Sequence, residues 1–178
     1  MKRLSKQEQN EQFEQAVMPH LHAAYNLARW LTRNDSDAED LVQESYLRAF
    51  RFFGGFRGGD ARAWLLKIVR NTCYTWFHEN RKQELSTEFD EEIHTVEGES
   101  PDPEALLLQG ADAKLLRQAL EELPVDFREA LVLRELEGLS YKEIAEVSGV
   151  SMGTVMSRLS RARHRLEIAL TSRAGKER

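Results

Sequence analysis

Residues 151–166 combine short polar and cationic side chains at helical spacing, a combination suited to binding nucleic acid. The segment carries no acidic residue between Met152 and Leu166. Apolar residues recur every three or four positions and form one face of a helix. Arginine and hydroxyl side chains hydrogen-bond phosphates and base edges, so the remaining positions predict DNA binding without covalent chemistry. The candidate DNA-contacting residues are Thr154, Ser157, Arg158, Ser160, Arg161 and Arg165.

A second helix and a tight turn should precede this one. Ser140 and Glu143 have the spacing of a capping box, which predicts a helix start. Gly149 can adopt the left-handed conformation that ends a helix. The spacing of Ala145, Gly149 and Val155 is typical of a DNA-binding helix-turn-helix.

A capped helical hairpin with a solvated cationic face is the alternative. Four residues in the first turns of the second helix argue against it, because they are mediocre helix formers: Ser151, Gly153, Thr154 and Ser157. Short polar side chains are useful where backbone N–H groups must approach phosphates and bases. DNA contact is therefore the favoured interpretation.

The composition indicates a soluble protein, and the near absence of period-two alternation, with Val and Ile at helical spacings, predicts an all-α fold. The 178 residues suit one medium domain or two small ones, and 41% of them are apolar while 31% are charged. No apolar run approaches the roughly 20 residues that span a bilayer, so we expect no membrane insertion. The polar segment 1–10 does not resemble a signal peptide. The single cysteine, Cys73, fits a reducing cytoplasm and should be an inert core thiol.

The charges are divided unevenly along the chain. The formal net charge is -5, yet residues 83–112 alone carry ten acidic residues and no lysine or arginine. The flanking segments are therefore mildly basic. We predict two small helical domains, at 1–83 and 112–178, joined by a flexible acidic linker at 84–111.

The N-terminal domain should begin with two helices. Apolar spacing predicts one continuous helix from near Glu8 to Thr32. A capping box of Ser36 and Glu39 predicts the start of the next, at about 37–47. Its expected inward residues are Leu41, Tyr46, Leu47 and Phe50. Two explanations remain open for the acidic and amide residues of this helix. The acids can stabilise the helix dipole at its N-terminus, or Asp40, Gln43 and Glu44 can form a polar stripe that binds a basic partner helix.

A glycine-rich loop at 54–59 leads into a helix at 61–81, capped by Asp60. The loop lacks the lysine and hydroxyl of a phosphate-binding loop. Cations interleaved with aromatic residues suit a single-strand-binding surface, since charge follows the backbone and rings stack on bases. A buried helix of a bundle is the alternative for part of this segment. The candidate residues are Phe56, Arg57, Arg62, Trp64, Lys67, Arg70, Asn71 and Tyr74.

The C-terminal domain should be a four-helix unit. Leucines and alanines at 115–123 have helical spacing, and Pro124 ends that helix and can begin the next. The next helix should run from Val125 to Glu137, where Gly138 ends it. The helix-turn-helix follows.

With the whole order in view, the chain resembles the extracytoplasmic-function sigma factors, the smallest class of bacterial sigma subunits. Three segments carry the resemblance: 37–44 (DAEDLVQE), 64–71 (WLLKIVRN) and 123–163, which begins with Leu-Pro and contains RELEGLSY and GTV. The resemblance as a whole covers nearly the full length, from about Phe13 to Leu170.

The resemblance implies a division of roles. One helix would bind the beta-prime clamp helices of RNA polymerase through Asp37, Asp40, Leu41, Gln43, Glu44 and Leu47. Region 56–71 would melt and read the minus-10 element of promoter DNA, and the helix at 154–161 would read the minus-35 element in the major groove. The beta flap of the polymerase is a further implied contact. The linker, including Asp90, Glu91 and Glu92, would follow the path of nascent RNA. The resemblance also implies an anti-sigma factor, and neither catalytic residues nor a cofactor or metal.

Two departures from the family pattern affect promoter preference. The family commonly has a cation where this chain has Met156, and an aspartate where it has Thr75. Two other functions compete with initiation. A stand-alone helix-turn-helix regulator would need a dimerisation or ligand-binding N-terminal half, and a sigma mimic that sequesters an anti-sigma factor would have lost the basic and aromatic DNA face.

Overall fold

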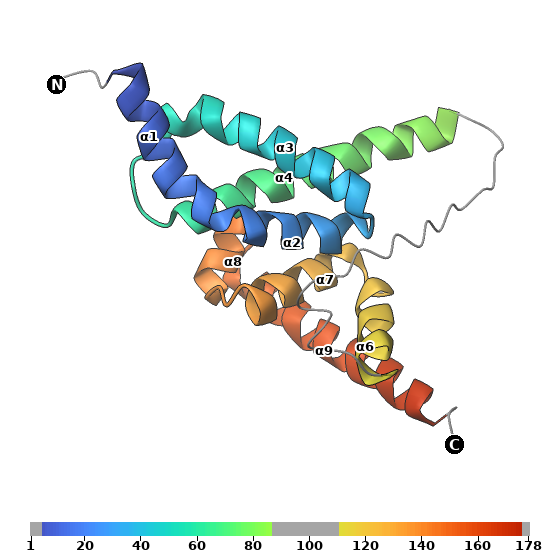
Figure 1. The fold of residues 1–178 in the computed structure, drawn as a ribbon. Helices are drawn as coiled ribbons and strands as arrows, with labels where there is room; N and C mark the ends of the chain where they lie inside the picture. Colours follow the sequence, from blue (N-terminus) through green and yellow to red (C-terminus); the bar gives the residue numbers. More distant parts are fainter. Residues whose placement is uncertain (1–4, 87–110, 176–178) are drawn as a thin grey trace.

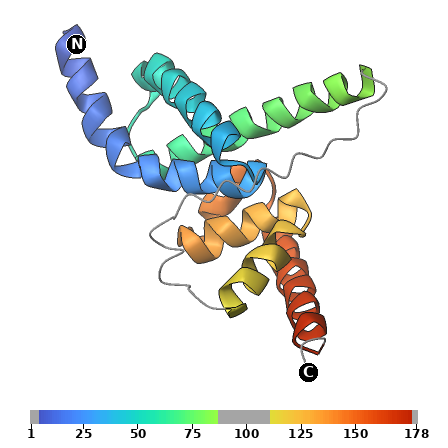
Figure 2. The ribbon, with the colours of Figure 1, turned by 45° about the vertical axis from the view of Figure 1, so that its right-hand side comes forward.

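The computed structural model describes residues 5–86 and 111–175, and all regular structure in those ranges is helical. This confirms the all-α prediction. The predicted linker falls mostly on residues 87–110, outside the described ranges, as do Asp90, Glu91 and Glu92. The chain folds into two helical lobes, which lie one above the other in both ribbon views (Figures 1 and 2).

Four α-helices and two short 3-10 turns form the N-terminal lobe. They are α1 (Lys6–Val17), η1 (Met18–His20), α2 (Leu21–Thr32), α3 (Asp35–Phe52), η2 (Phe53–Gly55) and α4 (Ala61–Ser86). Helix α2 packs against both α3 and α4. As predicted, Asp60 caps α4: its carboxylate accepts hydrogen bonds from the backbone N–H groups of Arg62 and Ala63, at 2.9 and 3.2 Å.

The predicted continuous helix from Glu8 to Thr32 is wrong, because the chain breaks at Pro19. Proline has no backbone N–H and its ring clashes with the preceding turn of an α-helix. The 3-10 turn η1, which contains Pro19, therefore separates α1 from α2. Helix α1 therefore projects at an angle from α2 (Figure 1).

Helix α3 begins two residues earlier than expected. Its N-cap is Asn34, whose side-chain oxygen accepts a hydrogen bond from the backbone N–H of Asp37 at 3.0 Å. Ser36 therefore does not cap the helix. Asn34 caps the helix instead, because an amide side chain caps at least as well as serine and the backbone of Asn34 has the extended conformation of an N-cap residue.

The inward face of α3 also differs from the prediction. Its buried residues are mostly small and recur at three- and four-residue steps: Ala38, Leu41, Ser45 and Ala49. Leu47 lies on the far side of the helix and is 65% exposed, and Phe50 is 46% exposed. Leu41 is buried as predicted, and the rings of Tyr46 and Phe50 pack edge-on against Phe13, with centroids 5.0 and 5.1 Å away. Of the predicted inward residues, Leu47 is therefore the one that points away from the core.

The C-terminal lobe contains α6 (Ala111–Glu121), α7 (Val125–Leu131), the π-helical turn η3 (Val132–Leu136), α8 (Tyr141–Ser148) and α9 (Met152–Ala174). The predicted four-helix unit is thus present. The helix expected to reach Glu137 changes from α to π at Val132, and Gly138, with a φ of 65°, ends it.

The helix-turn-helix is built as its sequence predicts. Ser140 and Glu143 form a reciprocal capping box at the start of α8. Gly149 ends α8 with a φ of 68°, a left-handed conformation that costs glycine little. Ser151 then caps α9 by accepting a hydrogen bond from the backbone N–H of Thr154 at 3.2 Å.

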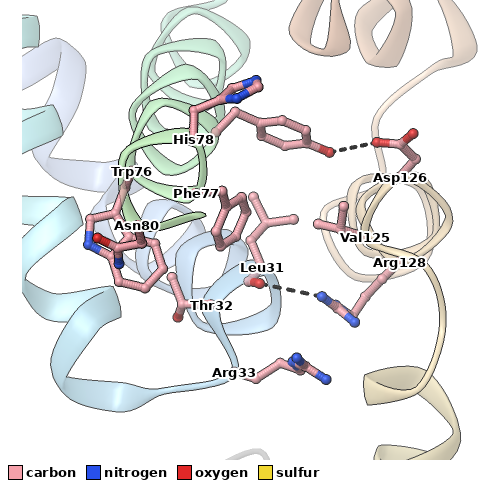
Figure 3. A pocket seen from close by; sticks show the side chains of 11 residues that line it. Leu31, Thr32, Arg33, Trp76, Phe77, His78, Asn80, Val125, Asp126 and Arg128 are labelled. Atoms are coloured by element: carbon pink, nitrogen blue, oxygen red, sulfur yellow. Dashed lines mark hydrogen bonds between the residues drawn. The ribbon is translucent and has the colours of Figure 1, made fainter. Parts of the chain in front are cut away.

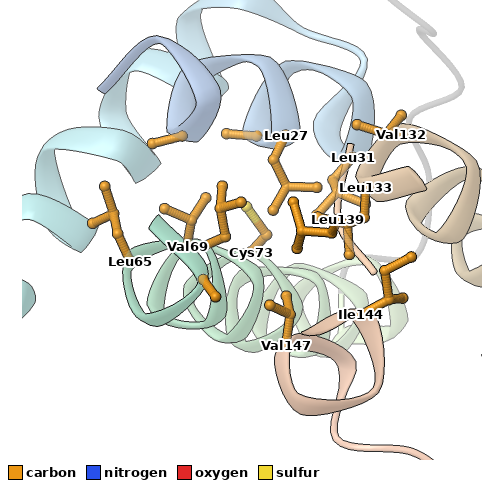
Figure 4. Packing of buried hydrophobic residues seen from close by; sticks show 14 of the residues in the cluster. Leu27, Leu31, Leu65, Val69, Cys73, Val132, Leu133, Leu139, Ile144 and Val147 are labelled. Atoms are coloured by element: carbon orange, nitrogen blue, oxygen red, sulfur yellow. The ribbon is translucent and has the colours of Figure 1, made fainter. Parts of the chain in front are cut away.

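One hydrophobic core runs through both lobes. Helix α4 packs on α8, and α2 packs on α7. Figure 4 shows Leu27 and Leu31 of α2 and Val69 of α4 meeting Leu133 and Leu139 of the C-terminal lobe. All five are at most 2% exposed. The two lobes therefore share buried apolar surface.

The thiol of Cys73 lies in this shared core and is fully buried. Burial, with a smaller effect of Glu129, raises its pKa to about 12. Because the thiolate is the reactive form, we expect no reaction with Ellman's reagent at pH 8 in the folded protein and complete reaction in denaturant. Rapid labelling without denaturant would show that this part of the core opens readily.

Candidate nucleic-acid and polymerase interfaces

The outer face of α9 carries three of the predicted minus-35 residues. Ser157, Ser160 and Arg161 are exposed, whereas Val155 and Leu159, on the opposite face, are each 1% exposed. Capping and apolar spacing thus fix the rotation of α9 so that a polar strip faces outward. That strip is available to the edges of base pairs.

The other three predicted minus-35 residues lie on flanks of α9 that have neighbours. The guanidinium of Arg158 is 3.5 Å from the Asp126 carboxylate of α7, and its side chain is only 20% exposed. Arg165 lies over the Phe127 ring at 5.2 Å. The hydroxyl of Thr154 is 3.0 Å from that of Ser151. Thr154 and Arg158 are partly buried and border the outward strip, whereas Arg165 remains exposed one turn beyond Arg161.

The glycine-rich loop gathers aromatic rings at the end of α4. The rings of Phe56 and Trp64 have centroids 5.0 Å apart, and Phe53 stacks on Phe56 at 5.7 Å. Gly58 and Gly59 adopt φ values of 86° and 100°, which let the loop turn back toward α4. Both Phe56 and Trp64 are half-buried, so one side of the cluster remains accessible.

The remaining predicted minus-10 residues divide into two groups. Arg57, Lys67 and Asn71 are exposed. Arg62, by contrast, donates a hydrogen bond to the backbone carbonyl of Glu137 in the C-terminal lobe at 2.8 Å. Arg70 and Tyr74 also turn toward that lobe. The sequence-predicted surface is therefore partly covered.

Arg70 and Tyr74 bind two carboxylates of α7, Asp126 and Glu129, which we call the acidic pair. Arg70 Nε donates to Glu129 at 2.8 Å. The Tyr74 hydroxyl is 2.9 Å from Glu129 and 3.0 Å from Asp126. The Arg70 guanidinium also lies over the Tyr74 ring at 3.7 Å. Since Asp126 reaches Arg158 as well, the acidic pair contacts cations from both candidate DNA surfaces.

Glu129 is the most enclosed charged group of this cluster, with a fully buried side chain. Burial raises its pKa, while the Arg70 guanidinium and the Tyr74 hydroxyl partly counteract that effect. Burial, followed by the charge of Glu129, also raises the pKa of Tyr74, so its hydroxyl remains a donor. Sequence reasoning missed the acidic pair, whose only signal is two acids three positions apart.

A cleft of about 640 Å³ lies beside this cluster, between α2, α4 and α7 (Figure 3). Arg128 borders it and is 4% exposed. Its guanidinium donates to the backbone carbonyls of Glu121 and Leu123 at 2.8 and 2.9 Å, and to that of Leu31 at 3.4 Å. Burial lowers its pKa to about 10, so it stays charged at neutral pH. Arg128 thereby links the C-terminal end of α2 in one lobe to the C-terminal end of α6 in the other.

The predicted polymerase-binding residues mostly share the outer face of α3. Asp40, Gln43, Glu44 and Leu47 are exposed. Asp37 is half-buried, and burial raises its pKa, with a smaller effect of Asp40. Leu41 is 3% exposed and packs in the lobe's core, so a direct contact through its side chain is wrong. Acids and an exposed leucine thus form one accessible surface.

None of the helices in residues 5–86 and 111–175 is long and apolar enough to cross a membrane. Across the same ranges no group of three or more potential ligands could hold a metal ion.

A helical lobe with an aromatic and cationic long helix, followed by a helix-turn-helix lobe, defines a DNA-binding transcription factor. The sequence matches "Sigma-70 region 2" over residues 16–83 and "Sigma-70, region 4" over residues 113–166. Together the two matches cover more than half of the chain. The chain belongs to the sigma-70 family, in its extracytoplasmic-function class.

Curated relatives include named sigma factors of RNA polymerase. The chain is 36% identical over 154 residues to the ECF RNA polymerase sigma factor SigE of Mycolicibacterium smegmatis, with 86% of this chain and 60% of that protein aligned. It is 34% identical over 165 residues to the RNA polymerase sigma-H factor of Pseudomonas aeruginosa, with 89% and 86% aligned. The chain thus spans 60% of the length of the first relative and 86% of the second.

Solved structures of similar fold include two complexes. The sigma factor RpoE, co-crystallised with the anti-sigma factor NepR from Bartonella quintana, matches with a TM-score of 0.73 and 31% identity over 90% of this chain and 98% of that one. CnrH, in complex with the cytosolic domain of CnrY, matches with a TM-score of 0.64 and 25% identity, covering 92% and 90%.

Proposed function

We propose that this sigma factor binds RNA polymerase core in the cytoplasm and directs it to promoters. Sigma factors are not enzymes, and the polymerase carries out RNA synthesis. The observation that carries the proposal is the outward strip of α9 in a chain that also has a region 2 lobe. A helix-turn-helix protein that acts alone has no need of such a lobe.

The roles divide along the chain. Domain 1–83 would bind the core through the exposed face of α3 and read the minus-10 element through the aromatic cluster and the cations of α4. Domain 112–178 would read the minus-35 element through α9 and lie beside the beta flap. Segment 84–111 would connect them. Exposed Arg57, Lys67 and Asn71 support the minus-10 role.

The packed arrangement of the lobes would be the inactive state, held by an anti-sigma factor. Arg62, Arg70 and Tyr74 are all engaged by the C-terminal lobe, so single-stranded DNA cannot reach them. The similar RpoE structure is of a sigma factor bound to an anti-sigma factor, and the similar CnrH structure is of a complex with the cytosolic domain of CnrY. Promoter binding would then require the lobes to separate.

A selection experiment tests the proposal. Core polymerase mixed with the protein should retain a defined subset of random promoter-length DNA fragments, and core alone should not. Selection by the protein without core, at sites made of two half-sites, would favour a stand-alone regulator. Binding to an anti-sigma factor with no DNA selection at all would favour a sigma mimic.

Arg161 should read a base in the minus-35 element. Arg161→Ala is expected to weaken binding of the holoenzyme to the selected promoter by about 1–3 kcal/mol and to relax preference at one base position. Arg165→Ala, the matched arginine on the flank, should weaken all sequences alike and flatten the salt dependence. Equal weakening of every sequence by Arg161→Ala would contradict a base-reading role.

Asp40 and Glu44 should serve polymerase binding and not folding. Both are exposed, so Asp40→Ala and Glu44→Ala should change the free energy of unfolding by no more than about 0.5 kcal/mol. Affinity for core, measured by fluorescence anisotropy, should nevertheless fall. Glu11→Ala on α1, also an exposed acid, is the control. A lowered melting temperature with unchanged core affinity would mean that these acids only support their helix.

A further inference from the structure

Two methionines lie exposed on the first turns of α9. Met152 is 46% exposed and Met156 is 50% exposed, and four residues separate them, so they form one apolar strip along the helix. The core-facing positions of the same turns are already filled by Val155 and Leu159. The methionines therefore do not serve the packing of the lobe.

Their neighbours place this strip within the proposed DNA-reading face. Ser160 lies one turn beyond Met156 on the same side of α9, and it is exposed. Arg158, the cation nearest to these turns, leans toward Asp126. The first exposed cation of α9 is Arg161. The turns that would enter a groove first thus present thioether and hydroxyl groups.

This chemistry selects one feature of the major groove. The N-terminal residues of a recognition helix contact base edges, and the thymine C5-methyl is the apolar group displayed there. Methionine is flexible and polarisable and fits irregular apolar surfaces. It has no strong donor for guanine, so facing a G·C pair would leave acceptors without a partner.

We propose that Met156 determines specificity by packing against the methyl group of one thymine in the minus-35 element. The inference rests on the proposed function, since it needs α9 in the major groove. It assigns to this position an apolar readout, beside the hydrogen-bonding readout of Ser157 and Arg161.

Replacing thymine by uracil removes only the methyl group and tests the contact directly. Each thymine in the minus-35 half of a selected promoter is changed singly to deoxyuridine, and holoenzyme affinity is measured by competition. For the parent protein one position should lose about fourfold, the equivalent of one buried methyl group. For Met156→Ala the same substitution should change nothing. Ile168→Ala is the control, an exposed apolar residue three turns further along α9.

The outcomes separate the inference from the function beneath it. Tolerance of every uracil by the parent, or uracil sensitivity that persists in Met156→Ala, would overturn the methyl contact. Loss of core binding by Met156→Ala with unchanged DNA preference would assign the residue to a protein contact instead. If the parent holoenzyme selected no promoter, the proposed function would be wrong, and the methyl contact, which depends on it, would be wrong as well.

Discussion

Glu129→Gln is expected to separate the two lobes while leaving each folded. Glutamine keeps the shape of glutamate but leaves the Arg70 guanidinium, whose side chain is 17% exposed, without its buried counter-charge. Removal of one partner of a buried ion pair typically destabilises the folded arrangement by about 3–5 kcal/mol. Separation relieves that cost by returning Arg70 to water, so the closed population should fall by orders of magnitude.

The separation can be measured as a distance between labels. Cysteines placed at exposed Arg51 on α3 and exposed Ser172 on α9 accept dyes, in a Cys73→Ala background because separation of the lobes would expose the Cys73 thiol. The variant should shift the distance distribution to longer values and raise affinity for single-stranded DNA, because Arg70 and Tyr74 become accessible.

Glu135→Gln is the matched control for this change. Glu135 pairs with Arg163 at 2.8 Å, but both side chains are about half exposed and lie within one lobe. Such surface pairs contribute about 0–1 kcal/mol, so the lobe distance should not change. An unchanged distance in Glu129→Gln, with the protein still folded, would show that apolar contacts alone hold the lobes together.

Leu133→Ala should destabilise the whole chain by about 2–5 kcal/mol. Leu133 is fully buried in the π-helical turn, where the cores of the two lobes meet (Figure 4). Leu136→Ala, three residues later in the same turn and 50% exposed, should change stability by no more than about 0.5 kcal/mol. Denaturant titration measures both, and similar values for the two variants would contradict the observed orientation of this turn.

Local sequence signals predicted the fold wherever the cause is local. The capping box of Ser140 and Glu143, the glycine at 149 and the apolar spacing of α9 each act within a few residues, and the helix-turn-helix follows from them. The errors have local causes too. Pro19 interrupts an otherwise continuous apolar pattern, and small residues of α3 line the inward side that Leu47 was expected to share.

The packing of the lobes could not be predicted in this way. Arg70 and Glu129 are 59 residues apart in sequence, and Arg62 and Glu137 are 75 apart. The helical periodicity of apolar residues carries no information about pairs so far apart in sequence. An arginine suited to DNA phosphate is equally suited to a carboxylate, so the residue types of α4 fit both partners. Sequence alone therefore identified a basic surface without showing what covers it.

Runoff transcription tests the central claim most directly. Core polymerase is given one DNA fragment obtained by selection, with and without this protein, and transcripts are sized. We predict a transcript of defined length that requires the protein and that disappears when the minus-10 or minus-35 half of the fragment is scrambled. Equal transcription with and without the protein, or a product insensitive to both scrambled halves, would contradict the assignment as a promoter-specific sigma factor.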